Sequence, residues 1–187
     1  KERADFMAAE KLELDRIAEM GTIEGEVEIP KGIKPIDSKI IYDWKDTVSQ
    51  EGMHQHGEGP PPERMAKARL TMKDMKDVPN YMSDTVREVF APTGAALTFR
   101  LLICIMLLSN MVCEHIDVST AFLYADLDVP VYMNPPPGYS CSPGHCLKVV
   151  KALYGCRTAP RDWFKLLRGF ILSLGFIESI LDPCLFH

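Results

Sequence analysis

Hydrophobic positions in the N-terminal part of the chain change from a helical to a strand-like spacing. Over 5–20, apolar side chains recur at helical spacing between charged ones, and Gly21 follows as a stop signal, which predicts an acidic surface helix. Over 23–29, apolar residues alternate with glutamates, which predicts a short, half-exposed strand. β-Forming residues are then concentrated over 39–45 and 65–72, and we expect these two strands to pair as an antiparallel hairpin.

The segment between the two hairpin strands, residues 49–62, has a different composition. It contains three glycines and three prolines without an apolar period, so we expect a flexible loop. Lys67 and Arg69 follow on the returning strand, two positions apart. Side chains two apart on a strand lie on the same face, where paired cations can bind phosphate oxygens. A solvated strand face is the plainer alternative.

Hydrophobic positions in the second half of the chain predict more buried helices and strands than those in the first half. A helix is expected to start at Thr93 and to run to residue 108, and it is apolar on nearly all sides, which predicts burial. An apolar run over 112–118 predicts a central strand that ends at Asp117. The remaining predicted elements are a short helix over 121–127, strands over 131–133 and 146–150, and an amphipathic helix over 160–174 that begins at Pro160.

Composition indicates a globular domain, and the charge distribution indicates two regions suited to anions. The 187 residues are 47% hydrophobic and 25% charged, which excludes collagen-like and wholly disordered chains. The net charge of −5 argues against a nucleic-acid binder, but it is unevenly spread. Residues 1–30 carry −5, whereas 61–76 carry +3 and 148–168 carry +5, so a site for polyanions is expected in these two basic regions.

Two groups of ionisable residues are candidates for chemistry. Asp117 would end an apolar strand, where a carboxylate needs a partner or a metal ion, although a cap or an ion-pair partner is the more common role. The second basic region surrounds a predicted helix start, whose backbone amides also favour anions. Its cations are Lys148, Lys151, Arg157, Arg161, Lys165 and Arg168. A basic helix is usually a solvated one, so this pattern alone leaves both interpretations open.

Cysteine usage and the longest apolar run indicate the environment of the chain. The six cysteines lie mostly in apolar surroundings, which favours a reduced, intracellular protein. Cys141, His145 and Cys146 could supply three ligands within one turn, but their spacing matches no standard zinc set, so a metal role is disfavoured. The apolar run over 101–113 is shorter than the roughly 20 residues of a membrane span, and no membrane association is expected.

Several short strings, taken together and in order, resemble the reverse transcriptases of copia-type retrotransposons. Ile-Asp-Val-Ser-Thr-Ala-Phe-Leu at 116–123, followed by Pro-Pro-Gly-Tyr at 136–139, resembles their first catalytic motif. Lys-Ala-Leu-Tyr-Gly at 151–155, with Pro-Arg-Asp-Trp at 160–163, is similar to the next motif. The flanking strings that fit the family are Lys-Ala-Arg-Leu at 67–70, Phe-Ala-Pro at 90–92, Gly-Phe at 175–176 and Asp-Pro-Cys at 182–184.

This resemblance implies an α+β fold of the right-hand polymerase type, with an antiparallel sheet and packed helices. Residues 1–91 would form mainly the fingers, including the flexible loop at 49–62, and 92–187 would form an incomplete palm that contains the helix of the second motif. The Tyr-x-Asp-Asp turn supplies the family's other two catalytic carboxylates. It would follow the last strand, so we expect the chain to be truncated before it.

The resemblance also implies an activity and a set of site residues. The family comprises RNA-directed DNA polymerases that use two Mg²⁺ ions, a primed RNA or DNA template and deoxynucleoside triphosphates. Asp117 matches the first metal-binding carboxylate, and the backbone carbonyl of Val118 would lie beside the second ion. The remaining matches are Lys67 and Arg69 on the triphosphate, Phe122 as an aromatic gate against ribose, and Tyr154 and Gly155 against the nucleotide and template.

We therefore expect a segment of a retrotransposon polyprotein that does not polymerise alone. It would act inside the cell, in a virus-like particle or in the nucleus, together with downstream polymerase and RNase H segments. An alternative is a non-catalytic remnant that binds nucleic acid through Arg157, Arg161 and Lys165 of the second basic region. A third possibility is a pseudogene product that folds poorly because its palm sheet is incomplete.

Overall fold

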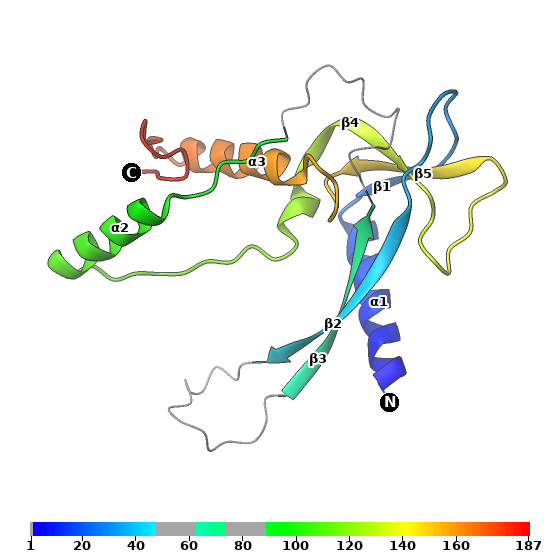
Figure 1. Cartoon of the computed structure of the whole chain (residues 1–187), viewed down its shortest axis with the longest axis horizontal. Coiled ribbons are helices and arrows are strands. Elements are labelled where there is room, and N and C mark those ends of the chain that lie inside the picture. The colour runs from blue at the N-terminus through cyan, green and yellow to red at the C-terminus, as the bar shows by residue number, and fades with distance from the viewer. Residues whose placement is uncertain (1, 48–62, 74–88) are drawn as a thin grey trace.

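The computed structural model describes residues 2–47, 63–73 and 89–187, which form three α-helices, one 3₁₀ helix and five strands. The strands make two antiparallel sheets, one of three strands and one of two (Figure 1). This mixed α/β architecture with antiparallel sheets agrees with the sequence-based expectation. The loop predicted over 49–62 lies outside the described residues.

The two-stranded sheet is the predicted hairpin. Strands β2 (Ser38–Thr47) and β3 (Glu63–Met72) pair antiparallel along their whole length, which confirms the prediction. Side chains alternate across β3, and its buried face includes Leu70, which has no exposed surface. Lys67 and Arg69 share the opposite face, as their spacing predicts.

The three-stranded sheet has the order β1-β5-β4, and both of its pairs are antiparallel. β1 (Ile23–Glu28) and β5 (His145–Lys151) confirm two of the predicted strands to within one residue at each end. β4 (Asp126–Met133) extends the strand that was predicted only for its last residues. Because β4 begins so early, the short helix predicted over 121–127 is limited to a 3₁₀ helix, η1 (Ala121–Tyr124).

Backbone hydrogen bonds join the hairpin to the three-stranded sheet. The N–H of Ile36 donates to the carbonyl oxygen of Tyr132 at 2.8 Å, and the N–H of Asn134 donates to the carbonyl oxygen of Ile36 at 2.8 Å. Buried side chains from both sheets and from η1 form one core, which includes Ile36, Leu70, Met72, Leu123, Val131, Met133, Val149 and Leu153. The hairpin is therefore held firmly against the rest of the fold.

Two helices confirm the elements predicted at the ends of the chain. α1 (Glu2–Glu19) lies along β3 and inserts Ile17, which is 2% exposed, into the core. α3 (Ala159–Ser173) begins with Pro160 in its first turn and lies beside η1 and β4. α1 buries Glu13 and Ile17, whereas the buried residues of α3 are confined to its first turn. The apolar face predicted for α3 is largely open, since Leu166, Phe170 and Leu174 are exposed.

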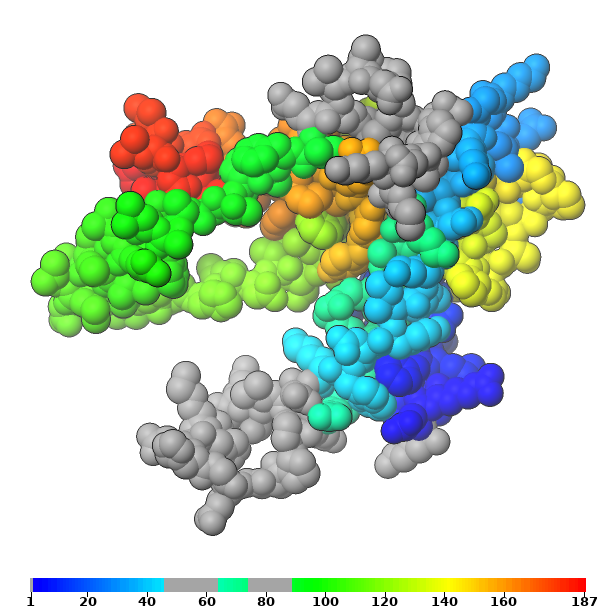
Figure 2. All heavy atoms as spheres, viewed as in Figure 1, coloured from blue at the N-terminus to red at the C-terminus, as the bar shows by residue number. Residues whose placement is uncertain are grey.

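α2 (Ala96–Leu108) forms as a helix but does not have the buried position that its sequence predicts. None of its residues is buried, and Leu108 is 88% exposed. Figures 1 and 2 show α2 on an arm that stands out from the two sheets. A helix that is apolar all round is buried only where other elements cover it. In the described part of the chain, residues 182–185 lie against its first turns and leave the rest open.

The prediction of a central strand over 112–118 is wrong. These residues form an irregular, exposed connection between α2 and η1. A strand needs neighbouring backbone that pairs with its N–H and carbonyl groups. Among the residues that the structure describes, no strand pairs with this segment. Asp117 therefore lies on an exposed connection rather than at the end of a buried strand.

Candidate active site

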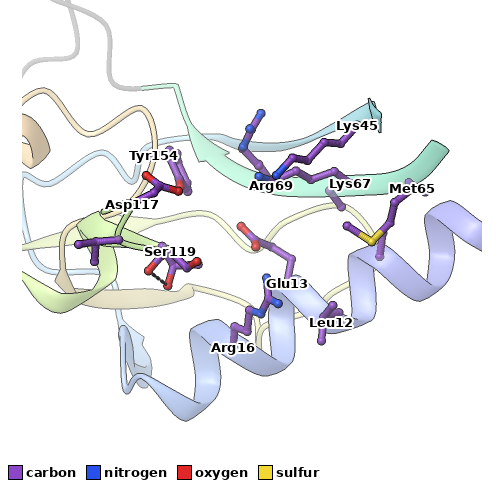
Figure 3. Close-up of a pocket in the computed structure, with 15 residues that line it drawn as sticks. Leu12, Glu13, Arg16, Lys45, Met65, Lys67, Arg69, Asp117, Ser119 and Tyr154 are labelled. Atoms are coloured by element: carbon purple, nitrogen blue, oxygen red, sulfur yellow. Dashed lines mark hydrogen bonds between the residues drawn. The ribbon is translucent and has the colours of Figure 1, made fainter. Parts of the chain in front are cut away.

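A cavity of about 450 Å³ lies between α1, the hairpin and the connection that carries Asp117 (Figure 3). Asp117, Ser119 and Tyr154 lie at one end of it, and Lys45 and Met65 lie at the other. The other lining residues are Ala9, Leu12, Glu13, Arg16, Ala66, Lys67, Ala68, Arg69, Val118 and Thr120. The cavity thus brings together five residues that the sequence analysis singled out: Lys67, Arg69, Asp117, Val118 and Tyr154.

The cavity is more basic than the chain as a whole. Its charged lining residues are the cations Arg16, Lys45, Lys67 and Arg69 and the carboxylates Glu13 and Asp117, whereas the whole chain has a net charge of −5. Burial lowers the pKa of the Lys67 ammonium, and the neighbouring positive charge of Arg69 lowers it further. A bound anion relieves this repulsion between cations, so the cavity is suited to a polyanionic ligand.

Arg69 and Tyr154 pack together at the end of the cavity that holds Asp117. The guanidinium carbon of Arg69 lies 5.9 Å from the centroid of the Tyr154 ring, which is within the range of a cation–π contact. The Tyr154 ring packs edge-on against Phe122, with 5.3 Å between the ring centroids. Phe122 does not itself line the cavity, and it supports Tyr154 from behind. The Tyr154 ring thus contacts both the Arg69 guanidinium and the Phe122 ring.

Gly155 allows the turn at Tyr154 to approach β3 closely. The N–H of Met72 donates to the carbonyl oxygen of Tyr154 at 2.8 Å. Gly155 has a φ of +83°, and a Cβ atom there would lie 2.1 Å from the carbonyl oxygen of Met72. A side chain at this position would therefore be both strained and in collision. In the structure, the backbone at Gly155 therefore packs closely against β3.

Asp117 is the carboxylate at the open end of the cavity, and its side chain is exposed. A pair of Mg²⁺ ions requires several oxygen ligands. In the described ranges, no group of three or more His, Cys, Asp and Glu side chains lies close enough together to hold a metal ion. This finding covers the turn with Cys141, His145 and Cys146, and it means that the described residues do not by themselves form a two-metal site.

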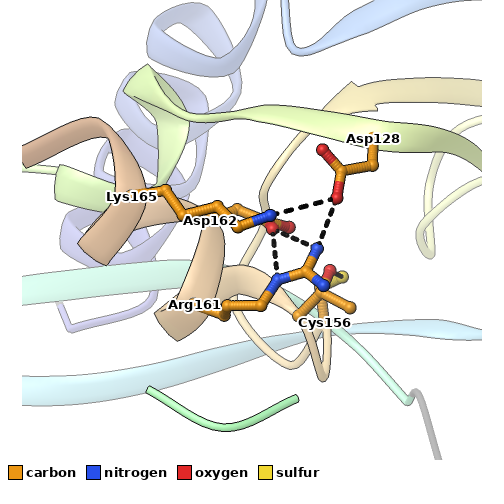
Figure 4. A network of polar contacts seen from close by, with 6 residues as sticks. Asp128, Cys156, Arg161, Asp162 and Lys165 are labelled. Atoms are coloured by element: carbon orange, nitrogen blue, oxygen red, sulfur yellow. Dashed lines mark hydrogen bonds and ion pairs between the residues drawn. The ribbon is translucent and has the colours of Figure 1, made fainter. Parts of the chain in front are cut away.

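Arg161 belongs to a polar network at the start of α3 (Figure 4). Its side chain is 11% exposed, donates from Nε to Asp162 at 2.9 Å and pairs with Asp128 at 2.6 Å. These contacts tie α3 to β4, and they engage Nε and Nη2 of Arg161 with carboxylates. Lys165 remains 55% exposed at 3.5 Å from Asp128, and Arg157 is partly exposed in the turn before the helix.

Two cavity residues on α1 were not singled out from the sequence. Glu13 is 7% exposed, and its carboxylate accepts a hydrogen bond from the N–H of Leu70 at 3.2 Å. Burial raises the pKa of Glu13, and the hydrogen bond from Leu70 and the charge of Arg16 partly oppose this effect. In the sequence, Glu13 and Arg16 look like the other charges of an acidic surface helix. The apolar residues Leu14, Ile17 and Met20 mark the buried face of the helix, but nothing in the sequence shows that Glu13 belongs to it.

The described residues thus define a mixed α/β chain with a basic cavity beside a single exposed carboxylate. Residues 24–187 match the protein-family model described as reverse transcriptase (RNA-dependent DNA polymerase). This match covers most of the chain, so the chain belongs to the reverse transcriptase family. No solved structure matches the chain.

Curated relatives are Pol polyproteins of copia-type transposons, which confirms the resemblance seen in the sequence. The chain is 28% identical over 187 residues to the retrovirus-related Pol polyprotein from transposon TNT 1-94 of Nicotiana tabacum, covering 99% of the chain and 13% of the relative. It is 34% identical over 122 residues to that of transposon RE1 of Arabidopsis thaliana, covering 64% of the chain and 8% of the relative. It is 23% identical over 184 residues to the transposon Ty1-ER2 Gag-Pol polyprotein of Saccharomyces cerevisiae, covering 96% of the chain and 9% of the relative.

The chain therefore spans only a small part of each of these relatives. Among the described residues, no helix is long and apolar enough to cross a membrane.

Proposed function

We propose that the chain is the fingers and N-terminal palm of an RNA-directed DNA polymerase and that its cavity binds the incoming deoxynucleoside triphosphate. One observation carries this proposal. The cations of β3, the turn at Tyr154 and the carboxylate of Asp117 come from separate parts of the chain and line one basic cavity. A triphosphate is a polyanion, and a guanidinium binds phosphate oxygens through parallel hydrogen bonds.

Five of the lining residues, with Phe122 behind them, have a definite role in this proposal. Arg69 and Lys67 bind the triphosphate, and the ring of Tyr154 holds Arg69 and faces the nucleotide. Phe122 keeps the Tyr154 ring in place. Because it does not line the cavity, we propose that it acts against ribose only indirectly, through the position of the Tyr154 ring. Asp117 and the Val118 carbonyl are the part of the Mg²⁺ site that this chain contributes. The remaining ligands have to come from outside the described residues, so no catalytic step is assigned to the described residues alone.

Nucleotide binding is the direct test of this proposal. We expect the chain to bind dTTP in the presence of Mg²⁺ in a calorimetric titration, and Arg69→Ala to raise the Kd about tenfold, because one charged hydrogen-bonding group is lost. Lys39→Ala is the matched control, since Lys39 is an exposed cation of the same hairpin that does not line the cavity. A chain that does not bind dTTP, or an equal effect of both substitutions, would overturn the proposal.

Primer extension separates binding from catalysis. On poly(rA) primed with oligo(dT), with Mg²⁺ present, we expect no incorporation by this chain, because one carboxylate cannot hold two metal ions. Incorporation that is lost in Asp117→Asn would contradict the expected inactivity and would show that the chain completes its own metal site.

A non-catalytic remnant that binds nucleic acid is the second candidate function. It is favoured by the exposed position of Lys165 on α3. This function predicts salt-dependent binding to a primed template that weakens in Lys165→Ala and does not change in Asp117→Asn. A primed-template affinity that falls in Asp117→Asn with Mg²⁺ present would instead favour the polymerase segment.

A further inference from the structure

α1 forms one wall of the cavity that β3 faces. Its residues Ala9, Leu12, Glu13 and Arg16 line the cavity and recur at helical spacing, so they share one face of the helix (Figure 3). Arg16 is the cation among these four. It lines the same cavity as Lys67 and Arg69, which lie on the other side in β3.

The backbone position of Arg16, which is itself exposed, is fixed by two buried residues near it on α1. Glu13 accepts the hydrogen bond from the N–H of Leu70 at 3.2 Å, and Ile17 is buried in the core. The N–H of Thr22 donates to the carbonyl oxygen of Ile17 at 3.1 Å, which joins the end of the helix to the start of β1. α1 therefore cannot rotate Arg16 away from the cavity without breaking these buried contacts.

The charges of α1 show that a cation facing the cavity is unusual for this helix. The helix as a whole is acidic, with six carboxylates against three cations between Glu2 and Glu19. Lys11 and Arg16 are both exposed cations of this helix, but Arg16 lines the cavity and Lys11 does not. The positive charge of Arg16 adds to the electrostatic repulsion between Lys67 and Arg69. A bound anionic ligand would offset this repulsion.

We propose that Arg16 is a third phosphate-binding residue of the cavity and that α1 is part of the nucleotide site. This inference rests on the proposed function. α1 precedes residues 24–187, which the family model covers, so the family match assigns nothing to it. A guanidinium on the wall opposite β3 would contact the phosphate chain from the side that Lys67 and Arg69 do not reach. The competing explanation is that Arg16 only balances the charge of Glu13.

The first test compares two cations of the same helix. Binding of dTTP in the presence of Mg²⁺ is measured for the unsubstituted chain, Arg16→Ala, Lys11→Ala and Arg69→Ala. We expect Arg16→Ala to raise the Kd about tenfold, as Arg69→Ala does, and Lys11→Ala to change it less than about twofold. If Arg16→Ala behaves like Lys11→Ala while Arg69→Ala weakens binding, this inference fails and the proposed function stands. If the unsubstituted chain does not bind dTTP, both fail.

The second test separates phosphate binding from charge balance. Arg16→Ala is made again in a Glu13→Gln background, in which the charge to be balanced is gone and an oxygen acceptor for the N–H of Leu70 remains. A direct contact predicts the same weakening in both backgrounds. If the effect of Arg16→Ala disappears in the Glu13→Gln background, Arg16 serves Glu13 and the proposal is overturned. Circular dichroism of each variant verifies that α1 is intact.

Discussion

The N–H of Met72 donates a hydrogen bond to the carbonyl oxygen of Tyr154 at 2.8 Å. This bond joins the last residue of β3 to the turn after β5, although the two residues are distant in the sequence. Because β3 also carries Lys67 and Arg69, the bond sets the position of these cations relative to the Tyr154 ring. The geometry of the cavity thus depends on a hydrogen bond between backbone groups, and not only on its charged side chains.

Substitution of Gly155 tests this contact. We expect Gly155→Ala to destabilise the fold by more than about 3 kcal/mol, because the left-handed backbone costs about 1–2 kcal/mol for alanine and the collision with Met72 adds to it. The added Cβ would lie 2.1 Å from a backbone oxygen, so relief requires that the turn move away from β3. Urea denaturation measures the change in the free energy of unfolding.

Gly144→Ala is the matched control for that substitution. Gly144 has a φ of +79°, close to the +83° of Gly155, but a Cβ there meets nothing within 4 Å. The difference between the two variants therefore isolates the contact with Met72. Equal destabilisation by both substitutions would mean that the close approach of the turn to β3 does not matter.

Glu13 is expected to stabilise the fold as a hydrogen-bond acceptor rather than as a charge. In Glu13→Ala the buried N–H of Leu70 loses its acceptor, which we expect to cost about 1–3 kcal/mol. Glu13→Gln keeps an oxygen acceptor and is expected to be at least as stable as the unsubstituted chain at pH 7. Urea denaturation of both variants compares these values, and equal losses in the two variants would contradict the expectation.

The raised pKa of Glu13 gives this comparison a pH dependence. Burial raises the pKa in the folded state above its unfolded value, so the folded chain holds this proton more tightly. The resulting stability is present below the unfolded pKa and is lost as the pH rises through the folded pKa. Glu13→Gln lacks this loss, so its stability relative to the unsubstituted chain should increase as the pH rises above about 4.

The sequence predicted best those elements in which a regular alternation of apolar and polar residues marks the side that faces the core. The amphipathic α1 and the alternating β1 each turn one face towards the core, and this face is visible as a period in the sequence. α3 forms as predicted, but its apolar face is largely exposed beyond the first turn. α2 and the segment 112–118 are different, since an apolar run indicates burial without indicating what covers it. In the described part of the chain both are exposed, so the inference from composition to burial failed there.

The candidate site was predictable only where residues lie close together in the sequence. The spacing of Lys67 and Arg69 predicts a shared strand face. Asp117 was a candidate because of the apolar run before it, but its role, like that of Tyr154, came only from strings that resemble a family. Glu13 and Arg16 were missed because their importance comes from contact with a strand that follows far along the chain, and no local pattern records such a contact.

Arg161 is predicted to matter for folding more than for nucleic acid binding. Its removal would leave the carboxylate of Asp162, which is 3% exposed, buried without its charged partner. We expect Arg161→Ala to cost about 3–5 kcal/mol of stability. Arg168→Ala is the control, because Arg168 pairs with Glu178 from a 43% exposed position on the same helix and should cost less than about 1 kcal/mol. Similar thermal stability of the two variants would refute this assignment.

Asp182 anchors the exposed arm at the start of α2. Its carboxylate accepts hydrogen bonds from the N–H of Ala95 at 3.0 Å and from the N–H of Cys184 at 2.9 Å. In Asp182→Ala we expect the amides at the start of α2 to exchange with solvent about tenfold faster, because the charged acceptor is lost. Hydrogen exchange measured by mass spectrometry checks this, with Asp15→Ala as the control, since Asp15 is an exposed carboxylate on α1.

The same anchor is expected to fail in acid. The hydrogen bond from the Thr98 hydroxyl, followed by those from the N–H groups of Ala95 and Cys184, lowers the pKa of Asp182 in the folded state. A lowered pKa gives stability that is present above the unfolded pKa and is lost as the pH falls through the folded pKa. The arm should therefore loosen below about pH 4. Asp182→Asn has no carboxylate to protonate, so an arm that loosens with the same acid profile in that variant would show that another group controls it.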